Sequence, residues 1–121
     1  MAAINSEEHG DVLVVSFTDF KILDEARIQE IGYELMALVG NTPSGKMLLD
    51  FKGVTFMSSA MIGKIIQLNK KCKDASVDLR LCTISPNVME VFKLMRLHKV
   101  LNIQKDLETG LKSFEKGGWF K

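Results

Sequence analysis

The stretch LLDFKGVTFMSSAMIG, residues 48–63, joins a strand to a helix through two serines. The apolar run at 47–51 predicts a short buried strand, which Lys52-Gly53 interrupts. Ser58 and Ser59 stand where the apolar residues change to helical spacing, which is kept by Met61, Ile65, Leu68 and Cys72. The two hydroxyls are therefore expected at the first turn of an amphipathic helix, beside unpaired backbone N–H groups. A serine there can cap the helix, and the same place suits a phosphate.

Strands and helices alternate along the rest of the chain. Residues 11–17, DVLVVSF, are almost continuously apolar, which is typical of a strand covered on both faces. The other expected strands are 47–51, 79–83 and the short segment 101–104. The expected helices are 25–39 after the N-cap Asp24, 59–73, one that begins at Ser85-Pro86, and one that follows Asp106. This order predicts an α/β fold, with a mixed, mostly parallel sheet of about four or five strands packed with about four helices.

Charge, hydropathy and cysteine content argue against a nucleic-acid-binding protein, a membrane-spanning protein and a secreted, disulfide-bonded protein. The 16 basic and 15 acidic residues leave a formal charge of +1, which argues against direct nucleic-acid binding. No stretch reaches the roughly 18 apolar residues of a membrane span. The N-terminus lacks the pattern of a signal peptide, and two cysteines make no disulfide framework. We therefore expect a cytoplasmic protein that forms one domain over residues 1–121.

The usual signatures of catalysis and of metal or cofactor binding are missing from the sequence. Neither phosphate-loop pattern, GxxxxGK[ST] or GxGxxG, occurs. His9 and His98 lie far apart, without a metal-spaced partner. The serines do not form a nucleophile elbow, because Met57 and Met61 stand where that motif needs glycine. The prediction is a protein that is not an enzyme and has neither cofactor nor metal.

The sulfur-containing side chains are expected mainly in the core. Those that fall at core positions of the predicted elements are Met61, Met89, Met95, Cys72 and Cys82. Met57 precedes its helix, and we expect it to be partly exposed.

The order of strand, Phe-Met-Ser-Ser turn and helix resembles the STAS domain of anti-sigma factor antagonists, and the resemblance covers almost the whole chain. Residues 48–51 match the end of the family's central strand. Residues 54–57 match the segment that leads into its serine motif. Ser58 stands in place of the family's Asp, and Ser59 in place of its phosphorylated Ser. Ala60, Met61 and Gly63 then take the places of the second serine and the two glycines. Outside the motif, residues 22–24 and 84–92 resemble the segments before the family's first and third helices.

The resemblance implies a protein switch. Family members bind a partner, often an anti-sigma factor that is a serine kinase, while the motif serine is free, and they lose it on phosphorylation; a phosphatase reverses the change. Phosphorylation is accordingly expected at Ser59, with Ser58 as the alternative acceptor. The expected partner-binding residues are Asp24, Met57, Ser58, Ser59, Met61 and Gly63. Asp24 is expected near the serines, and its alternative role is simply to cap its helix.

Three departures indicate a divergent member of the family, with a different partner or without phosphorylation. Ser58 removes a carboxylate beside the phosphorylated hydroxyl, Ala60 removes a second hydroxyl, and Met61 adds a flexible thioether. Two other functions stay open: a constitutive scaffold in a signalling assembly, and a sensor of nucleotides or lipids. Trp119 and Phe120 follow a glycine pair and either fold back over the last helix or form a docking tail. The sequence leaves the oligomeric state open.

Overall fold

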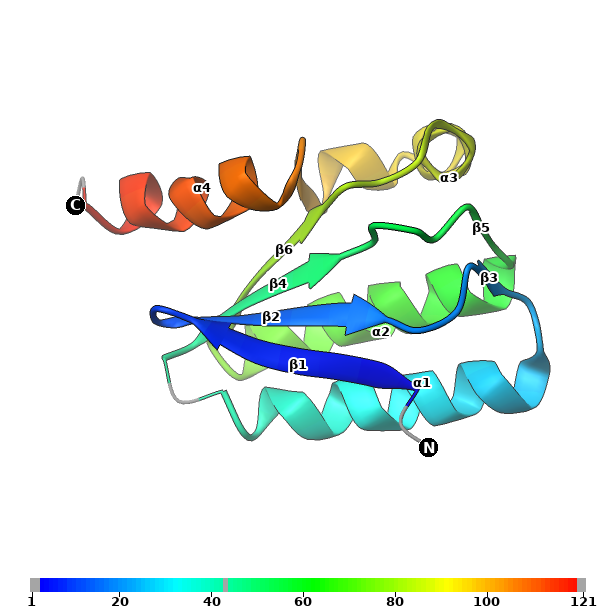
Figure 1. Cartoon of the computed structure of the whole chain (residues 1–121), viewed down its shortest axis with the longest axis horizontal. Helices are drawn as coiled ribbons and strands as arrows, with labels where there is room; N and C mark the ends of the chain where they lie inside the picture. The colour runs from blue at the N-terminus through cyan, green and yellow to red at the C-terminus, as the bar shows by residue number, and fades with distance from the viewer. Residues whose placement is uncertain (1–2, 43, 120–121) are drawn as a thin grey trace.

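A computed structural model describes residues 3–42 and 44–119, and side chains as far as residue 115. Its elements, in chain order, are β1 (Ile4–His9), β2 (Val12–Phe17), β3 (Lys21–Ile22), α1 (Glu25–Val39), β4 (Lys46–Asp50), β5 (Phe56–Met57), α2 (Ser59–Asp74), β6 (Asp78–Cys82), α3 (Pro86–Leu94), the 3₁₀ turn η1 (Leu97–Lys99), β7 (Asn102–Gln104) and α4 (Leu107–Trp119). Figure 1 shows the helices on both faces of a twisted sheet. The predicted α/β fold with four helices is confirmed.

The main sheet has five strands in the order β1-β2-β4-β6-β7. Strand β1 runs antiparallel to β2, and the remaining pairs are parallel. A second sheet consists only of the short parallel strands β3 and β5. The mixed, mostly parallel sheet is therefore confirmed, and the small second sheet adds a pairing that the sequence did not predict.

Strand β1 was not expected, because its sequence INSEEH has no apolar period. It is an edge strand, and only Ile4 within it is buried. Pairing with β2 over all six residues holds it in the sheet. Near its start, the Ala3 N–H donates to the Glu34 carboxylate on α1 at 3.2 Å. Backbone pairing and this helix contact, more than side-chain burial, thus stabilise β1.

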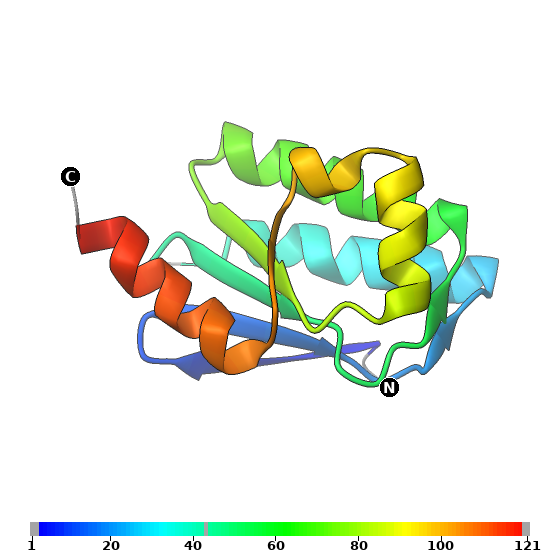
Figure 2. The same cartoon turned by 90° about the horizontal axis from the view of Figure 1, so that it is seen from above.

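The larger part of the core lies between the sheet and helices α1, α2 and α3, and a smaller part lies under α4. Figure 2 shows α4 on the opposite face of the sheet from α1 and α2. Strand β2 faces both parts: Val15 and Phe17 pack in the larger core, and Val12 and Val14 pack under α4. The prediction that this strand is covered on both faces is confirmed. Gly110 lets α4 approach the sheet closely, because an added Cβ would lie 3.0 Å from a Leu48 methyl carbon.

The cysteines are buried as predicted, but two of the methionine predictions are wrong. Burial raises the pKa of the Cys72 thiol to about 11 and that of Cys82 to about 12, because the thiolate would lose its hydration. Met57 is buried rather than partly exposed, because β5 turns its side chain into the core. Met95 is 43% exposed, because it follows the last turn of α3 and lies beyond the packed stripe of that helix.

The remaining expectations concern Met61, Met89 and the C-terminus. Met61 is fully buried, as expected, and Met89 is half-buried against the core. The expectation for Trp119 and Phe120 lies outside the described side chains.

Candidate functional site

The small β3–β5 sheet places the two serines next to the start of α1. Ile22 and Met57 pair in register, and the Ser58 N–H donates to the Ile22 carbonyl at 3.0 Å. Because the two strands are parallel, the chain leaves both at the same end. Leu23 and Asp24 therefore follow β3 beside the point where Ser58 and Ser59 follow β5.

Ser58 occupies the N-cap position of α2, but its hydroxyl does not cap the helix. Its backbone is extended, with φ −77° and ψ 165°, and its carbonyl accepts from the N–H groups of Met61 and Ile62 at 3.1 and 3.2 Å. Its Oγ atom is buried and has no hydrogen-bond partner among the described residues. A serine was predicted to cap this helix. Ser58 does so only through its backbone carbonyl, and its hydroxyl takes no part.

Ser59 is the first residue of the 16-residue helix α2, and it is exposed. The N–H groups of Ser59 and Ala60 make no hydrogen bond within the described part of the chain. The first turn of α2 contains no acidic residue, so no carboxylate of its own offsets the positive end of the helix dipole. The hydroxyl of Ser59 therefore lies in a setting that favours an added negative charge.

Asp24 caps α1, because its Oδ2 accepts from the Arg27 N–H at 2.9 Å. The predicted cap is therefore present. Asp24 follows β3 by two residues, so the β3–β5 pairing places it beside the serine turn, by which we mean Ser58 and Ser59. The two expected roles of Asp24 are compatible, since one carboxylate oxygen makes the cap and the residue is exposed.

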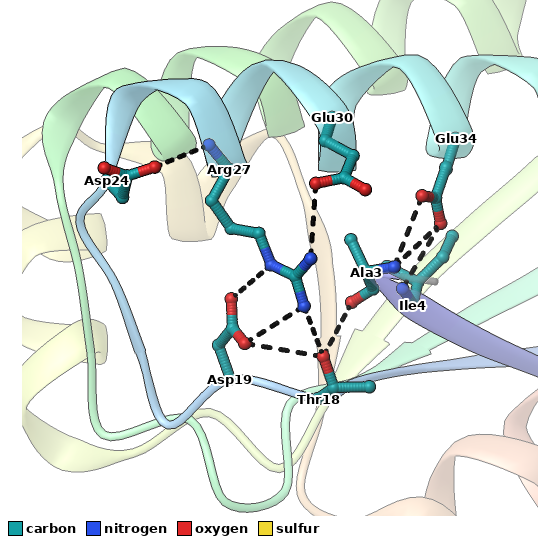
Figure 3. Close-up of polar contacts among 8 residues, drawn as sticks. All are labelled: Ala3, Ile4, Thr18, Asp19, Asp24, Arg27, Glu30 and Glu34. Atoms are coloured by element: carbon teal, nitrogen blue, oxygen red, sulfur yellow. Dashed lines mark hydrogen bonds and ion pairs between the residues drawn. The ribbon is translucent and has the colours of Figure 1, made fainter. Parts of the chain in front are cut away.

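Arg27 fastens the loop that precedes β3, as Figure 3 shows. Its Nε donates to Asp19 Oδ2 at 2.8 Å, and its Nη2 donates to Thr18 Oγ1 at 2.9 Å. Nη2 also donates to Asp19 Oδ1 at 3.3 Å, and Nη1 donates to Glu30 at 3.2 Å. The hydrogen bond from Arg27 holds the pKa of the Asp19 carboxyl below its usual value. The loop is thus anchored directly before Phe20.

Three large apolar side chains are exposed around the serine turn. Phe20 is 74% exposed, Leu23 51% and Phe56 45%. Phe56 belongs to β5, while Phe20 and Leu23 flank β3, and the Phe20 carbonyl accepts from the Thr55 N–H at 2.8 Å. The β3–β5 pairing thus brings these three residues onto one small element, and exposed apolar residues grouped in this way are typical of a protein contact surface. We call the surface formed by Phe20, Leu23, Asp24, Phe56 and Ser59 the serine surface.

The sequence analysis missed the three apolar members of the serine surface. A signal was present, because Phe20, Leu23 and Phe56 fall between the predicted elements, where no helix or strand period requires an apolar residue. Their exposure follows from the β3–β5 pairing, and neither two-residue strand has a recognisable pattern.

Two of the expected partner-binding residues are unavailable at the surface. The side chains of Met57 and Met61 are 3% and 0% exposed, so neither can contact a partner directly. Both pack in the core because β5 and the apolar stripe of α2 direct them inwards. Gly63 lies one turn after Ser59, and an added Cβ there would meet no atom within 4 Å. Gly63 thus offers bare backbone next to the serine surface.

The described part of the chain shows no group of three or more His, Cys, Asp or Glu placed to hold a metal ion. Over the same residues, none of the helices combines the length and the apolar character that crossing a membrane requires.

Comparison with known proteins agrees with this architecture. The chain is similar to an anti-sigma-factor antagonist (STAS) domain protein from Planctomyces limnophilus, with 22% identity, coverage of 91% of this chain and 96% of that one, and a TM-score of 0.79. It is also similar to an anti-sigma factor antagonist from Mycobacterium paratuberculosis, with 20% identity, coverage of 91% of each chain and a TM-score of 0.80. For the Bacillus cell fate determinant SpoIIAA in its phosphorylated form, the identity is 14%, the coverage 94% of this chain and 98% of that one, and the TM-score 0.69. These likenesses show a shared fold.

The family model of the STAS domain matches residues 3–110, which is nearly the whole chain. The match includes all five strands of the main sheet, the β3–β5 pair and the complete serine surface. This chain therefore belongs to the STAS domain family.

Proposed function

We propose that this chain is a non-catalytic signalling domain of the anti-sigma factor antagonist type. It binds a partner protein, a serine kinase of the anti-sigma factor class, through the serine surface. Phosphorylation of Ser59 releases the partner, and a phosphatase restores binding. Since the kinase uses cytoplasmic ATP, the proposal places the protein in the cytoplasm.

One observation supports the proposal: an exposed serine begins a long helix directly after β5, and the β3–β5 pair contains or is flanked by three exposed apolar residues. A phosphate on Ser59 would add about 1.5 to 2 negative charges. The free N–H groups of Ser59 and Ala60 and the dipole of α2 would stabilise that charge without unfolding the helix. The domain would therefore keep its fold while its contact surface changes.

The same phosphate would oppose a partner that covers Phe20, Leu23 and Phe56. Burial of a doubly charged group under an apolar contact costs several kcal/mol unless the partner supplies a matching cation. A loss of this size is enough to release a partner that binds in the micromolar range. Two solved structures similar to this chain, of SpoIIAA, are of its unphosphorylated and its phosphorylated form, which supports a switch of this kind.

Ser58 is not the acceptor in this proposal. Its Oγ atom is buried, whereas a kinase must bring ATP within bonding distance of the hydroxyl that it phosphorylates. Ser59 on the next residue is exposed. The replacement of the family's Asp by Ser58 also removes a negative charge that would repel the incoming phosphate.

A phosphotransfer assay tests the site. The chain is incubated with purified serine kinases of the anti-sigma factor class from the same organism and with ATP, and the modified residue is mapped by mass spectrometry. We expect one phosphate on Ser59, lost in Ser59→Ala and kept in the matched control Ser58→Ala. Phosphate that persists in Ser59→Ala would contradict the proposal.

A further inference from the structure

A row of polar side chains crosses the sheet on the face where α4 lies. Asn5 pairs with Ser16, Ser16 with Asp50, Asp50 with Cys82, and Cys82 with Gln104. Residues paired in register point to the same side of a sheet, so the row spans all five strands. It runs through the carboxyl ends of the parallel strands, where α/β proteins commonly bind ligands.

Helix α4 covers only part of this face. Its Phe114 packs with Val12, Val14, Leu48 and Cys82, so the sheet is closed there. Beside that cluster, over β1 and β2, lies a cavity of about 340 Å³, which we call the open-face pocket. Its lining includes Asn5, Glu7, His9, Ser16, Asp50 and Leu107. The volume falls at the small end of the range for small-molecule sites.

Asp50 is the unusual member of the open-face pocket. The residue is only 8% exposed, yet no Lys or Arg of the described chain lies within ion-pair distance of its carboxylate. Its Oδ1 accepts from the Lys52 N–H at 3.2 Å and from the Cys82 thiol at 3.7 Å. Oδ2 receives no hydrogen bond from any described residue. Ser58 Oγ is the only side-chain N or O atom of the described residues that is both buried and unpartnered, so Oδ2 of Asp50 is open to solvent. Since Asp50 lines the pocket, this oxygen is a free acceptor that a cation could reach.

The rest of the pocket also favours a positive ligand. Glu7 adds a second carboxylate, which His9 contacts at 3.1 Å, and among the described residues no basic one other than His9 belongs to the lining. Ser16 and Asn5 offer further acceptor oxygens on neighbouring strands, about 5 Å apart. Val14 and Leu107 supply apolar surface beside them.

We propose that the open-face pocket binds a guanidinium group, with Asp50 as the residue that carries the recognition. A guanidinium is planar, presents several N–H donors in a fixed fork and sheds its water more readily than an ammonium does. The fork matches a carboxylate oxygen flanked by acceptors on adjacent strands, and its faces suit contact with Val14 and Leu107. The group comes either from a free guanidino compound or from an arginine side chain of another protein. The proposal does not depend on the phosphorylation of Ser59.

A binding experiment on the whole chain tests the pocket. The probes are N-acetyl-arginine amide and the isosteric but neutral N-acetyl-citrulline amide, titrated while backbone amide resonances are recorded by NMR. We expect the arginine probe to shift the resonances of Ser16 and Asp50 and to bind at least about tenfold more tightly than the citrulline probe. Equal binding of the two probes, or no shift at millimolar concentrations of the arginine probe, would overturn the proposal.

Substitutions of Asp50 and Glu7 test which carboxylate recognises the guanidinium group. Asp50→Asn keeps the shape and an acceptor for the Lys52 N–H, and it should weaken the arginine probe at least about tenfold. The matched control Asp74→Asn, at the exposed end of α2, should leave the affinity unchanged. If Asp50→Asn does not fold, Glu7→Gln on the exposed side of the pocket should still weaken the probe about threefold. Unchanged affinity in a folded Asp50→Asn variant would contradict the proposal. If Asp50→Asn does not fold, unchanged affinity in Glu7→Gln would contradict it instead.

Two further probes separate the sources of the guanidinium. Methylguanidinium represents a free small molecule, and the peptide Gly-Gly-Arg-Gly-Gly represents a protein side chain. Binding of both supports recognition of an arginine side chain, and binding of methylguanidinium alone supports a small-molecule site. Failure of both would overturn the proposal.

Discussion

Replacing Ser58 by alanine should not destabilise the domain, although Ser58 is the N-cap residue of a 16-residue helix. Loss of a capping serine normally costs about 0.5–2 kcal/mol. Here the Oγ atom makes no cap bond and is buried without a partner. Burial of an unpaired hydroxyl costs about 1–3 kcal/mol, and the space left by one oxygen atom costs up to about 1 kcal/mol. We therefore expect Ser58→Ala to change the free energy of unfolding by between about 0 and +3 kcal/mol.

Ser85 provides the matched control, because it is also a serine N-cap. Its Oγ accepts from the Val88 N–H at 3.3 Å, so Ser85→Ala should lose about 1 kcal/mol. Both free energies are measured by urea denaturation followed by far-UV circular dichroism, with the slopes compared to confirm a common unfolded state. The reasoning fails if Ser58→Ala loses as much stability as Ser85→Ala, because the hydroxyl of Ser58 must then make a bond that the structure does not show.

Three other predictions concern packing, charge and reactivity. Gly110→Ala should destabilise the domain by about 1 kcal/mol in thermal unfolding, because its Cβ would press on the fully buried Leu48; an unchanged melting temperature would show that α4 can shift. The pKa of Asp19 is lowered in the folded state, so its contact with Arg27 stabilises the fold above pH 3.8 and is lost as the pH falls below that value. Asp19→Asn should accordingly flatten the loss of stability below about pH 4, by less than about 1 kcal/mol because the pair is partly exposed. An unaltered pH profile would show that the Asp19–Arg27 pair is not the cause of that loss. The two cysteine thiols, with pKa values raised to about 11 and about 12, should resist iodoacetamide at pH 8 in the folded protein and react after unfolding; rapid alkylation of the native protein would contradict their burial.

The parts of the fold that were predictable have strong local signals. The apolar stripe of α2, the Ser85-Pro86 start of α3 and the capping Asp24 and Asp106 follow from residue type and spacing alone. Strand β1 was not predictable in this way, because an exposed edge strand has no hydrophobic period. The β3–β5 pair was missed for a related reason, since two residues carry no period at all.

In the candidate site too, the residues with a strong local signal were predicted and those placed by tertiary contacts were not. The sequence pointed to Ser59 and Asp24, whose positions depend on helix starts that can be recognised locally. It misplaced Met57, and it missed Phe20, Leu23 and Phe56, because exposure at these positions depends on how the two-residue strands β3 and β5 pair. The burial of the Ser58 hydroxyl likewise depends on tertiary packing and has no counterpart in the sequence.

The affinity of one purified partner kinase for the unphosphorylated and the fully Ser59-phosphorylated chain is the most direct test of the proposed switch. Isothermal titration calorimetry on both forms, with Ser76→Asp as a control for added charge at the other end of α2, gives the ratio of dissociation constants. The account predicts at least about 30-fold weaker binding after phosphorylation, or about 2 kcal/mol, and no change in the control. Equal affinity of the two forms would contradict it, and the domain would then be better described as a constitutive scaffold.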